Sequence, residues 1–584
     1  MTEPTRPAAG PPAPATAPGS RSAGEWAAHL PDGVIPDLAA GGSLPGAWTR
    51  AWRAIGDRVV LSTLDGRDVG AAELDERTGV AAGRYVAAGL VPGDRILLCG
   101  GTSVDLVVAY VGALRAGLTV VPANPAYTGA ELAALVDTAR PALAVLDHPD
   151  RLPASVRKST VDFSGLPATT GDVRLDAAGL DDTALVIYTS GTTGAPKGVP
   201  LSHGNLLASA HAVRVAWQWS PDDTLALCLP LFHVHGLGVG LHGTLLAGGA
   251  ATLIPRFDPG AVAAAIGRGA TLLFGVPTMY HRLADSPYLG DLARLRLAVS
   301  GSAPLPAELH EAVRAATGQA VLERYGMTET VMLVSNPYHG ERRPGTVGFP
   351  LPGVQLRLAE RAGGTAEIEV RGPNVIRSYL DNPAADSAAF TPDGWFRTGD
   401  LGVLDPDGYL RISGRAKELI ITGGYNVYPR EVEEVLRAHP RVADAAVVGW
   451  PDPVWGETVV AFVVPAGTRP VATTPTATGP GGGVSATVTL AERSTAAPPQ
   501  NSAAMPGELS AAMAEVSAGS GAVLPGGAPA SVPPGTPASA ALVSELDSWA
   551  QARLVDYKRP RQWRVVEVIP RNALGKILRH ELIP

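Results

Sequence analysis

A run of small hydroxylated and glycyl residues, IYTSGTTGAPKGV at 187–199, has the composition of a phosphate-binding loop. Backbone N–H groups and hydroxyls of such a loop can surround a phosphate chain, and Lys197 adds a positive charge. The stretch is not a Walker A loop, which requires Gly-Lys-Ser/Thr, because Pro196 precedes Lys197 and Gly198 follows it. A mere flexible linker would not directly follow the apolar segment TALVIYTS. The stretch therefore predicts a site for a chain of phosphates.

Lysine is rare in this chain, so each lysine position is informative. Of the 47 Lys and Arg residues only five are Lys, and one of them, Lys576, lies between Gly575 and Ile577. A lysine ammonium is a compact point charge on a flexible stem, whereas a guanidinium is broad and planar. The choice of Lys at position 576 therefore indicates a narrow site that needs a positive charge.

Six further motifs follow in the chain, and the whole set resembles the adenylate-forming acyl-CoA synthetases, whose relatives include acyl-CoA ligases, luciferases and peptide-synthetase adenylation domains. The resemblance covers nearly all of the chain outside an N-terminal tail and an insertion, and coincidence does not explain so many motifs in the family's order. The motifs are LPLFHVHG (229–236), VSGSAPLP (299–306), ERYGMTET (323–330), WFRTGDLG (395–402), GRAKELIITGGYNVYPREVE (414–433) and PRNALGKILR (570–579).

The resemblance implies an ATP site. Tyr325 is expected to stack on the adenine, with Gly301, Ser302 and Glu323 along the adenine edge. Thr328 is expected to contact the α-phosphate. The complete set of ATP contacts that the resemblance implies is Thr189, Ser190, Gly191, Thr192, Thr193, Gly194, Lys197, Gly301, Ser302, Glu323, Tyr325, Thr328, Asp400 and Arg415.

Three charged residues of these motifs have their own expected roles. Asp400 in RTGD is an acceptor suited to two ribose hydroxyls, and the resemblance makes Arg415 the second ribose contact. An ordinary turn aspartate is the alternative for Asp400, but it explains little when Arg415 and the phosphate loop are also present. By resemblance Glu329 holds Mg²⁺ against the triphosphate, and a carboxylate oxygen is a ligand that this ion prefers.

The resemblance also implies a two-step reaction. The carboxylate of an acid attacks the α-phosphate of ATP to give an acyl-adenylate and pyrophosphate, and the thiol of CoA then displaces AMP. Lys576 is expected to reach between the acid and the α-phosphate, and Lys417 to be the hinge on which a C-terminal domain swings between steps. Gly423 and Gly424 would border the passage of the pantetheine arm, because neither has a side chain. His233 is expected between acyl pocket and thiol entrance, with a core histidine as the common alternative.

The acid is predicted from LFGVPTMYHRL (273–283), a strand running into a helix that lines the acyl pocket in this family. Together with WQW (217–219), LPLFHVHG and ERYGMTET, this stretch most resembles malonyl-CoA synthetases, in which the arginine matching Arg282 binds the distal carboxylate of a dicarboxylic acid. A buried bidentate pair of this kind would favour malonate over acetate. A surface arginine is the alternative for Arg282. Arg256 is a second candidate for an acid contact, and Met327 is also expected in the acyl pocket.

The expected function is therefore an ATP-dependent acyl-CoA synthetase acting on malonate or methylmalonate. One alternative is a CoA ligase for a short- or medium-chain fatty acid or an aromatic acid. Another is an adenylation protein that loads a carrier protein. A third is an inactive nucleotide-binding homologue, against which the intact set of charged motif residues argues: Lys197, Glu329, Asp400, Arg415 and Lys576.

The elements that must position these residues follow from the apolar periodicity. Between about residues 25 and 412, short apolar runs alternate with helical patterns, which predicts parallel sheets covered by helices. Strands at 94–100 and 118–123 are expected on either side of a helix at 103–117, and a hairpin is expected at 406–415. The sequence predicts an α/β fold with a large N-terminal domain of helix-covered sheets.

The chain changes character after this domain. An amphipathic helix at 428–440, two strands, a further helix and a last strand predict a small, mobile α+β C-terminal domain. Residues 466–540 are rich in Pro, Gly, Ala, Ser and Thr and predict a disordered insertion. The expected domains are a disordered tail at 1–24, the N-terminal domain at 25–416 and the C-terminal domain at 417–584.

Composition excludes several classes of protein. The net charge of −8 argues against a nucleic-acid-binding chain. The longest apolar stretch, 236–254, is broken by His242 and several glycines, so it predicts core and not a membrane span. The N-terminal sequence has no apolar core of a secretory signal. Cys99 and Cys228 are the only cysteines and are expected to be buried. We expect a cytoplasmic protein whose partners are an acid, ATP and CoA, with Mg²⁺.

Overall fold

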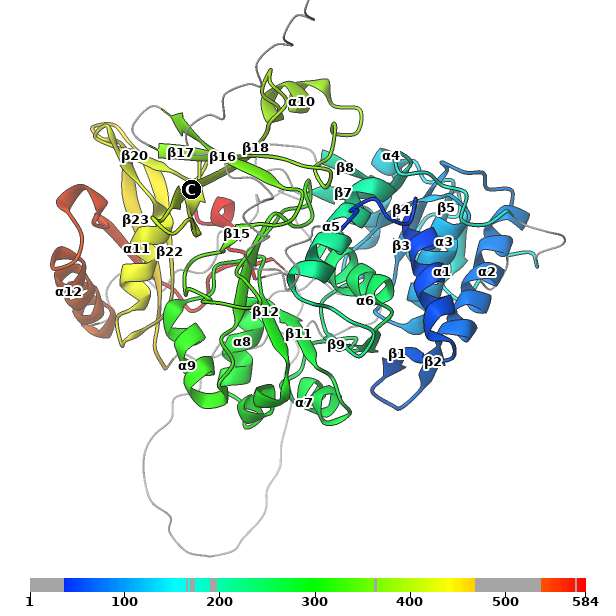
Figure 1. Cartoon of the computed structure of the whole chain (residues 1–584). Helices are drawn as coiled ribbons and strands as arrows, with labels where there is room; N and C mark the ends of the chain where they lie inside the picture. Colours follow the sequence, from blue (N-terminus) through cyan, green and yellow to red (C-terminus); the bar gives the residue numbers. More distant parts are fainter. Residues whose placement is uncertain are drawn as a thin grey trace, which may run out of the picture.

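The computed structural model describes residues 36–163, 166–168, 174–189, 197–361, 365–467, 537–572 and 575–583. Strands and helices alternate in these residues and build four sheets. Figure 1 shows the blue N-terminal elements at one side, the green elements in the middle, and the yellow and orange C-terminal elements at the other side. The two largest sheets are mainly parallel and carry helices, which confirms the predicted α/β fold.

A six-stranded sheet holds the strand that leads into the phosphate-loop sequence. Its order is β6-β5-β3-β4-β7-β8, and all its neighbouring pairs are parallel except β7 and β8. These two strands bracket the loop, because Thr189 pairs with Lys197. The strands are β3 Arg95–Cys99, β4 Thr119–Pro122, β5 Leu143–Leu146, β6 Lys158–Thr160, β7 Thr183–Thr189 and β8 Lys197–Ser202.

A nine-stranded sheet carries three other motifs. Ligands of parallel sheets bind beyond the carboxyl ends of the strands, and here three parallel neighbours, β11, β12 and β13, end at Gly275, Ser300 and Tyr325. The order is β15-β14-β13-β12-β11-β9-β10-β1-β2. The strands are β1 Val59–Thr63, β2 Asp68–Gly70, β9 Thr224–Leu227, β10 Ala250–Leu253, β11 Leu272–Gly275, β12 Leu297–Ser300, β13 Leu322–Tyr325, β14 Val334–Ser335 and β15 Phe349–Pro350.

A four-stranded antiparallel sheet follows in the chain. It consists of β16 Gln355–Arg361, β17 Thr365–Arg371, β18 Phe396–Leu404 and β19 Leu410–Arg415. Strands β18 and β19 form the predicted hairpin, and Gly408 takes φ +90° in its turn. The first strand of the hairpin lies before the predicted range 406–415, because PDG at 406–408 is the turn itself.

The fourth sheet has its own core. Its order is β21-β20-β23-β22, and β24 pairs in parallel with β23. Val432 and Leu436 of the amphipathic helix α11 Pro429–Arg437 and Leu546 of α12 Pro537–Gln551 pack into this core. The strands are β20 Ile420–Thr422, β21 Tyr425–Val427, β22 Val442–Asp452, β23 Gly456–Pro465 and β24 Gln562–Val565. The predicted tail at 1–24 and most of the predicted insertion at 466–540 lie outside the described residues.

Several of the remaining helices begin at a capping side chain. Thr128 and Glu131 form a capping box at α4, and Ser202 and Asn205 form another at α5. The α-helices are α1 Leu44–Ile55, α2 Ala71–Ala87, α3 Val104–Arg115, α4 Gly129–Ala139, α5 His203–Ala216, α6 His242–Ala247, α7 Pro259–Gly267, α8 Pro277–Ala284, α9 Ala307–Thr317 and α10 Pro383–Ala389. Short helical turns are η2 Pro149–Arg151, η3 His235–Leu241 (a π-helix), η4 Leu289–Arg294, η5 Asp556–Lys558 and η6 Arg579–Glu581.

The apolar stretch 236–254 is core, as expected. It forms η3, α6 and β10, and His242 inside it is fully buried with its Nε2 2.6 Å from the Tyr110 hydroxyl. In the part of the chain that the structure describes, no helix combines the length and the hydropathy of a membrane span. Cys99 and Cys228 are both buried free thiols.

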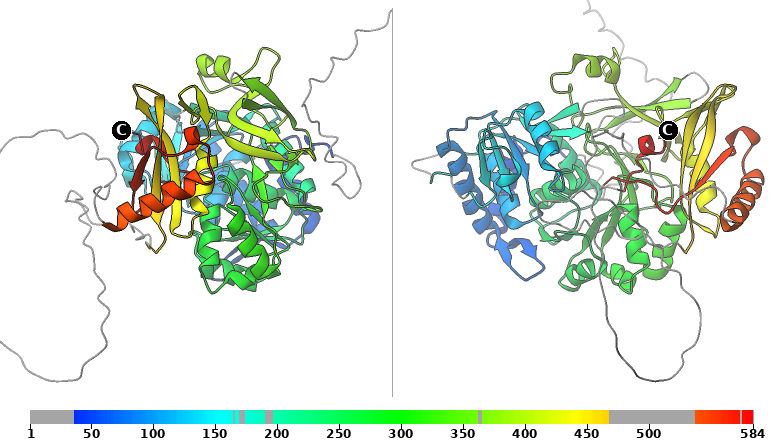
Figure 2. Two further views of the ribbon diagram at one scale, coloured as in Figure 1. Left: turned by 90° about the vertical axis from the view of Figure 1, so that its left-hand side faces the viewer. Right: turned by 180° about the vertical axis from the view of Figure 1, so that it is seen from behind.

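The C-terminal segment returns from the fourth sheet to the middle of the molecule. Figure 2 shows the red segment leaving the yellow strands and running beside the green elements. Ion pairs fix its course: Arg571 with Asp444 at 2.7 Å, and Arg579 with Glu433 at 2.5 Å and Glu418 at 3.1 Å. These pairs hold the segment to the C-terminal part of the chain, and Gly575, next to Lys576, lies close to Thr278 of α8.

Candidate active site

Asp400 and Arg415 face each other across the β18–β19 hairpin. The strand register pairs the two residues directly, and Arg415 Nε lies 2.9 Å from Asp400 Oδ1. Tyr325 donates its hydroxyl to Asp400 Oδ2 at 2.5 Å. The carboxylate of Asp400 raises the pKa of the Arg415 guanidinium. The structure thus brings together three residues that the sequence assigned to the adenosine part of ATP.

Lys197, Tyr379 and Glu329 form a second cluster. Lys197 Nζ lies 5.0 Å from the centroid of the Tyr379 ring, and the Tyr379 hydroxyl donates to Glu329 Oε1 at 3.0 Å. Lys197 is the first residue of β8 and therefore stands at the end of the phosphate-loop sequence, whose predicted contacts at 190–194 lie outside the described residues. Tyr379 was missed by the sequence analysis, because RSYLDNP around it belongs to none of the motifs.

A strained turn after β13 holds Glu329. Gly326 has no room for a side chain, since a Cβ atom there would lie 2.2 Å from Val331 O. Val331 takes φ +56°, a conformation that β-branched residues rarely adopt and that concentrates at functional sites. The Asn374 amide supports the turn by donating to Thr330 O at 2.8 Å. These constraints therefore hold the backbone around Glu329 in a single conformation.

The chemistry of Glu329 is compatible with magnesium. Burial raises the pKa of its carboxyl, while the hydrogen bond from Tyr379 and the charge of Arg415 oppose the rise. No group of three or more His, Cys, Asp or Glu side chains forms a metal site among the described residues. Mg²⁺ commonly takes one or two protein carboxylates and completes its coordination with substrate phosphates and water. A single carboxylate beside Lys197 fits that requirement.

The loop of Lys576 lies against helix α8. Gly575 takes φ +76°, and a Cβ atom there would lie 3.1 Å from Thr278 Cγ2 in the first turn of α8. The Lys576 backbone N–H donates to Asn572 Oδ1 at 3.0 Å, which closes the loop on itself. Close packing against α8 therefore requires glycine before the lysine.

The Lys576 side chain belongs to the same electrostatic site as the β18–β19 pair. Burial lowers the pKa of its ammonium, and the positive charge of Arg415 lowers it further. The carboxylates of Glu418 and Asp400 oppose this change. Lys576 is thus a half-buried cation near a second cation, a position that favours the arrival of an anion between them.

Ser302 follows β12, and Glu323 lies in β13. Ser302 takes φ +69°, and its hydroxyl is 3.1 Å from His235 Nδ1. Glu323 is 3% exposed and accepts a hydrogen bond from the Leu305 N–H at 3.0 Å. Burial raises the pKa of the Glu323 carboxyl to about 7. Gly301 precedes Ser302 and donates its N–H to Gly275 O at 3.2 Å.

The two histidines of LFHVHG differ in environment. His233 is half-buried against Phe232, with ring centroids 4.4 Å apart, and burial lowers the pKa of its imidazole to about 4. His235 is 2% exposed, and burial lowers its pKa as well. The motif contains both histidines, but only His233 was predicted as a site residue from the sequence. Both rings are neutral near neutral pH, so neither supplies a positive charge to the site.

Arg282 does not have the buried position that the sequence analysis expected. It is exposed in the last turn of α8, and its guanidinium lies 4.8 Å from the centroid of the Phe257 ring. The helical spacing from Thr278 was correct, but Arg282 lies on the exposed side of the last turn of α8, whose Leu283 is buried. Arg256 is exposed too, whereas Met327 and Thr328 are partly buried on the strained turn.

The expected CoA and hinge residues lie on the surface of the small sheet. Gly423 and Gly424 take φ +56° and +81° in the exposed turn between β20 and β21, and the Gly423 N–H donates to Trp455 O at 2.8 Å. Lys417 is exposed between β19 and β20. Lys576, and not the glycine turn, therefore interacts electrostatically with the β18–β19 pair.

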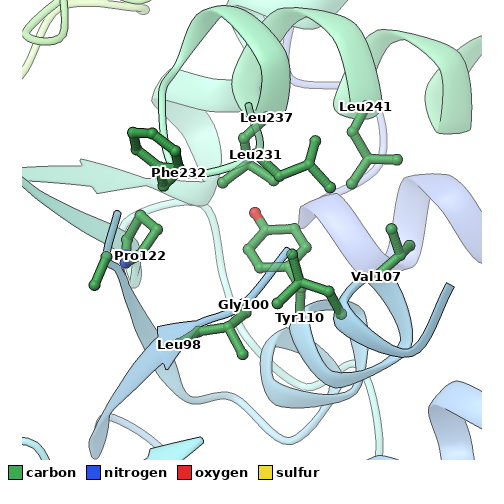
Figure 3. Close-up of a pocket in the computed structure, with 11 residues that line it drawn as sticks. Leu98, Gly100, Val107, Tyr110, Pro122, Leu231, Phe232, Leu237 and Leu241 are labelled. Carbon is green, nitrogen blue, oxygen red and sulfur yellow. The ribbon is translucent and has the colours of Figure 1, made fainter. Parts of the chain in front are cut away.

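One apolar cavity near the LFHVHG motif is too small for an acid. Figure 3 shows Phe232 and Leu231 on one side and Tyr110 and Leu98 on the other. Its volume is about 20 Å³, roughly what one water molecule needs. We therefore regard it as a packing gap and not as an acyl pocket.

Two family models match the chain. The model of the AMP-binding enzyme covers residues 48–380, and that of the AMP-binding enzyme C-terminal domain covers residues 431–478. The first match ends next to Tyr379 and so includes the cluster of Lys197 and Glu329.

Curated relatives are similar over most of their length. The chain is 32% identical to the mitochondrial malonate–CoA ligase of Bos taurus, over 91% of this chain and 88% of that protein. It is 38% identical to a feruloyl-CoA synthase of Amycolatopsis, over 68% of this chain and 83% of that protein. The relatives therefore share a reaction type but differ in the acid that they are named for.

Solved structures of CoA ligases are also similar to this chain. The crystal structure of ATP-bound MatB from Rhodopseudomonas palustris is 33% identical, covers 92% of this chain and 98% of its own, and has a TM-score of 0.74. A malonyl-CoA ligase in a ternary product complex with methylmalonyl-CoA and AMP is 37% identical, covers 92% of this chain and 100% of its own, and has a TM-score of 0.56.

Proposed function

The chain belongs to the family of AMP-binding enzymes, and from this premise we propose that it is an ATP-dependent acyl-CoA synthetase for a short dicarboxylic acid, malonate or methylmalonate. Its reaction type is that of an acid–thiol ligase, with ATP and CoA as the co-substrates. The acid, magnesium and the individual roles of the residues are parts of the proposal.

One observation carries the proposal: three separate parts of the chain converge on one site. The Asp400–Arg415 pair with Tyr325 suits adenosine, and the cluster of Lys197 and Glu329 suits the phosphates. Lys576 stands within electrostatic reach of both Asp400 and Arg415. A site that binds a nucleotide and also holds the positive charge of Lys576 is suited to joining two anions, the carboxylate of the acid and the α-phosphate.

In the first half-reaction, an oxygen of the acid's carboxylate attacks the α-phosphorus of ATP and the bond to pyrophosphate breaks. Lys576 reduces the repulsion between the two anions, and Lys197 neutralises charge on the departing phosphates. Glu329 would hold Mg²⁺, which stabilises negative charge on the phosphate oxygens when it is bound. No covalent bond to the enzyme is needed, so catalysis rests on positioning and on charge.

In the second half-reaction, the CoA thiol displaces AMP from the acyl-adenylate. Lys576 has to withdraw for the thiol to enter, and we propose that the unit beginning near Lys417 rotates to bring Gly423 and Gly424 to the acyl group. The absence of side chains at these two positions leaves a narrow passage for pantetheine. The exposed position of the glycine turn in this structure is compatible with such a movement.

The choice of acid is supported by the named relatives. Malonate is the acid of the bovine ligase, and methylmalonyl-CoA is bound in one of the similar structures. The identity of 38% to a feruloyl-CoA synthase favours an aromatic acid as the second candidate. An exposed Arg282 does not help to choose between these two acids.

Pyrophosphate release over a panel of acids, with and without CoA, tests the proposal. Malonate and methylmalonate should give a kcat/KM at least about tenfold above acetate, octanoate, benzoate and ferulate. Equal or faster turnover of ferulate would contradict the dicarboxylate assignment but not the ligase. Formation of AMP without a CoA thioester would favour loading of a carrier protein.

A further inference from the structure

The peptide group between Gly575 and Lys576 is held at both of its polar atoms. Arg571 Nη1 donates to Gly575 O at 2.6 Å, and the Lys576 N–H donates to Asn572 Oδ1 at 3.0 Å. The Lys576 carbonyl oxygen in turn accepts from the Asn572 N–H at 2.9 Å. Because a peptide group is planar, bonds to its C=O and its N–H fix the orientation of the whole group. These contacts therefore fix the direction in which the Lys576 side chain leaves the backbone.

Arg571 connects this peptide group to the small sheet. Its second terminal nitrogen, Nη2, donates to Asp444 Oδ2 at 2.7 Å. Asp444 lies in β22, and its other oxygen accepts from the Ala445 N–H at 2.9 Å. A guanidinium presents its donors in a rigid plane, so bonds from both terminal nitrogens set the position of one acceptor relative to the other. Arg571 therefore fixes the Gly575 carbonyl relative to β22.

An apolar contact anchors the other arm of the same loop. Ile577 packs against the cluster that includes Ala446 and Val448 of β22. Alternate residues of a strand point to the same face, so Asp444 shares one face of β22 with these two residues. Arg571 and Ile577 also face each other in an antiparallel bridge. Both arms of the loop are thus held on one face of the small sheet.

The anchored loop meets helix α8 of the large sheets. A Cβ atom on Gly575 would lie 3.1 Å from Thr278 Cγ2 in this helix. Burial lowers the pKa of the His281 imidazole one turn further along α8, and the charges of Asp444 and Arg571 act on it in opposite directions. The Arg571–Asp444 pair therefore lies where the loop meets α8.

We infer that Arg571, anchored by Asp444, is a positioning residue for the first half-reaction, in which it directs Lys576 to the gap between the acid and the α-phosphate. This inference rests on the proposed role of Lys576. A displacement of about 1 Å at a reacting group can lower a rate about a hundredfold. Arg571 and Asp444 both belong to the unit that we propose rotates, so the rotation leaves their pair intact. The second half-reaction, from which Lys576 has withdrawn, does not depend on the pair.

The test uses Arg571→Met in the full chain, with whichever acid the wild type converts fastest. The kcat for pyrophosphate release should fall by about tenfold or more, because methionine donates no hydrogen bond to Gly575 or Asp444. The KM for ATP should change by less than about threefold, since the predicted nucleotide contacts stay in place. Thioester formation from supplied acyl-adenylate and CoA should keep at least about a third of its rate. Equal loss of both half-reactions, or no loss of either, would overturn the inference.

Arg437→Met is the matched control. The side chains of Arg437 and Arg571 are 25% and 27% exposed, and both pair with Asp444, Arg437 at 3.4 Å. The other partners of Arg437 are Glu433 of α11 at 3.2 Å and Ala445 O of β22 at 2.6 Å. Both variants should lower the Tm, but Arg437→Met should leave the ratio of the two half-reactions unchanged. A loss of pyrophosphate release in Arg437→Met as selective as that in Arg571→Met would make the stability of the small sheet the cause and overturn the inference.

Asp444→Ala tests whether the carboxylate acts through the arginine. Its loss of pyrophosphate release should be smaller than that of Arg571→Met, because the bond to Gly575 O remains. The double variant should lose no more than Arg571→Met alone, since residues that act as a unit are not additive. Additive losses would overturn the claim that Asp444 anchors Arg571 for this step.

The variant Lys576→Arg separates this inference from the proposed function. If its pyrophosphate release stays at the wild-type rate, the proposed role of Lys576 fails, and the inference about Arg571 fails with it. If Lys576→Arg loses the first half-reaction and Arg571→Met keeps it, only the inference about Arg571 fails.

Discussion

Position 576 needs a positively charged group that is compact and can be withdrawn from the site. In this structure the ammonium is half-buried near Arg415, so a second bulky guanidinium would have to share the same space. Lysine has a narrow head and a flexible stem, and it can reach into a gap between a carboxylate and a phosphate. The rarity of lysine in this chain made the position visible in the sequence.

Lys576→Arg should separate the two half-reactions. Pyrophosphate release should fall by about a hundredfold or more, because the planar group fits poorly between the two anions. Formation of thioester from supplied acyl-adenylate and CoA should keep at least about a third of its rate. Stopped assays of pyrophosphate and thioester on the same preparation measure both.

Lys158→Arg is the matched control. Lys158 lies in β6, where its Nζ donates to Leu152 O at 2.6 Å, outside the site. Both half-reactions should be unchanged in this variant. An equal loss of both half-reactions in Lys576→Arg would mean that the lysine supports the fold and not the first step.

Glu323 gives a prediction about pH. Burial raises its pKa from 4.5 to about 7 in the folded chain. Between these two pKa values the folded state therefore binds more protons than the unfolded state. The free energy of unfolding therefore falls as the pH rises through this window. At about pH 8 the buried charge should cost on the order of 3 kcal/mol.

Glu323→Gln removes this dependence, because an amide does not titrate and its oxygen can still accept from Leu305. The variant should unfold at a higher temperature than the wild type at about pH 8, and the difference should vanish near about pH 4.5. Unfolding followed by circular dichroism across this range measures it. A difference in unfolding temperature that stays constant with pH would show that the pKa of the Glu323 carboxyl is not raised.

Single residues were predicted from the sequence only where a motif contained them. Asp400, Arg415 and Tyr325 meet as expected, because their positions in the motifs coincide with the ends of paired strands. Tyr379 was missed, because its contact to Glu329 arises from tertiary packing and leaves no local signal. The exposure of Arg282 depends on neighbours that are distant in the sequence.

At the scale of elements, the loop at Gly575 and the helix α8 have to fit together. The loop takes φ +76° at this glycine and leaves only 3.1 Å to Thr278 for a Cβ atom. Gly575→Val should keep the loop from seating, because a β-branched residue adopts this φ at a cost and its methyl groups would meet α8. The fold of the sheets should be unaffected.

Pyrophosphate release should therefore fall by about tenfold or more in Gly575→Val, with thioester formation from acyl-adenylate retained. Gly318→Val is the control, since Gly318 takes φ +74° and a Cβ there would contact nothing within 4 Å. It should lose some stability and keep both activities. If both variants lost the first half-reaction alike, backbone strain and not contact with α8 would be the cause.

The apolar periodicity of the sequence predicted whether an element is a helix or a strand. It predicted the first and last residues of each element less well. The buried runs at β3 and β4 and the helix α3 between them agree with the sequence, since both faces of a parallel strand are apolar. The hairpin of β18 and β19 was expected too late in the chain, because apolar residues resume on both sides of its turn. Helix α8 was expected correctly, but the exposure of Arg282 depends on how α8 packs against α9, which is distant in the sequence.

At the scale of the whole molecule, the two halves of the reaction need different groups at one site. This structure brings Lys576 to the Asp400–Arg415 pair and leaves Gly423 and Gly424 exposed. The residues between β19 and β20 are the short connection on which we propose that the small sheet rotates. The domain limits at 416 and 417 remain a prediction of the sequence.

Transfer of an oxygen atom tests the central claim most directly. Malonate labelled with ¹⁸O in its carboxylates is incubated with the enzyme, ATP, Mg²⁺ and CoA, and the products are examined by mass spectrometry. Attack of a carboxylate oxygen on the α-phosphorus, followed by displacement of AMP by the thiol, predicts malonyl-CoA together with AMP that carries one labelled oxygen. Unlabelled AMP, label in inorganic phosphate with release of ADP, or no malonyl-CoA at all would contradict the account.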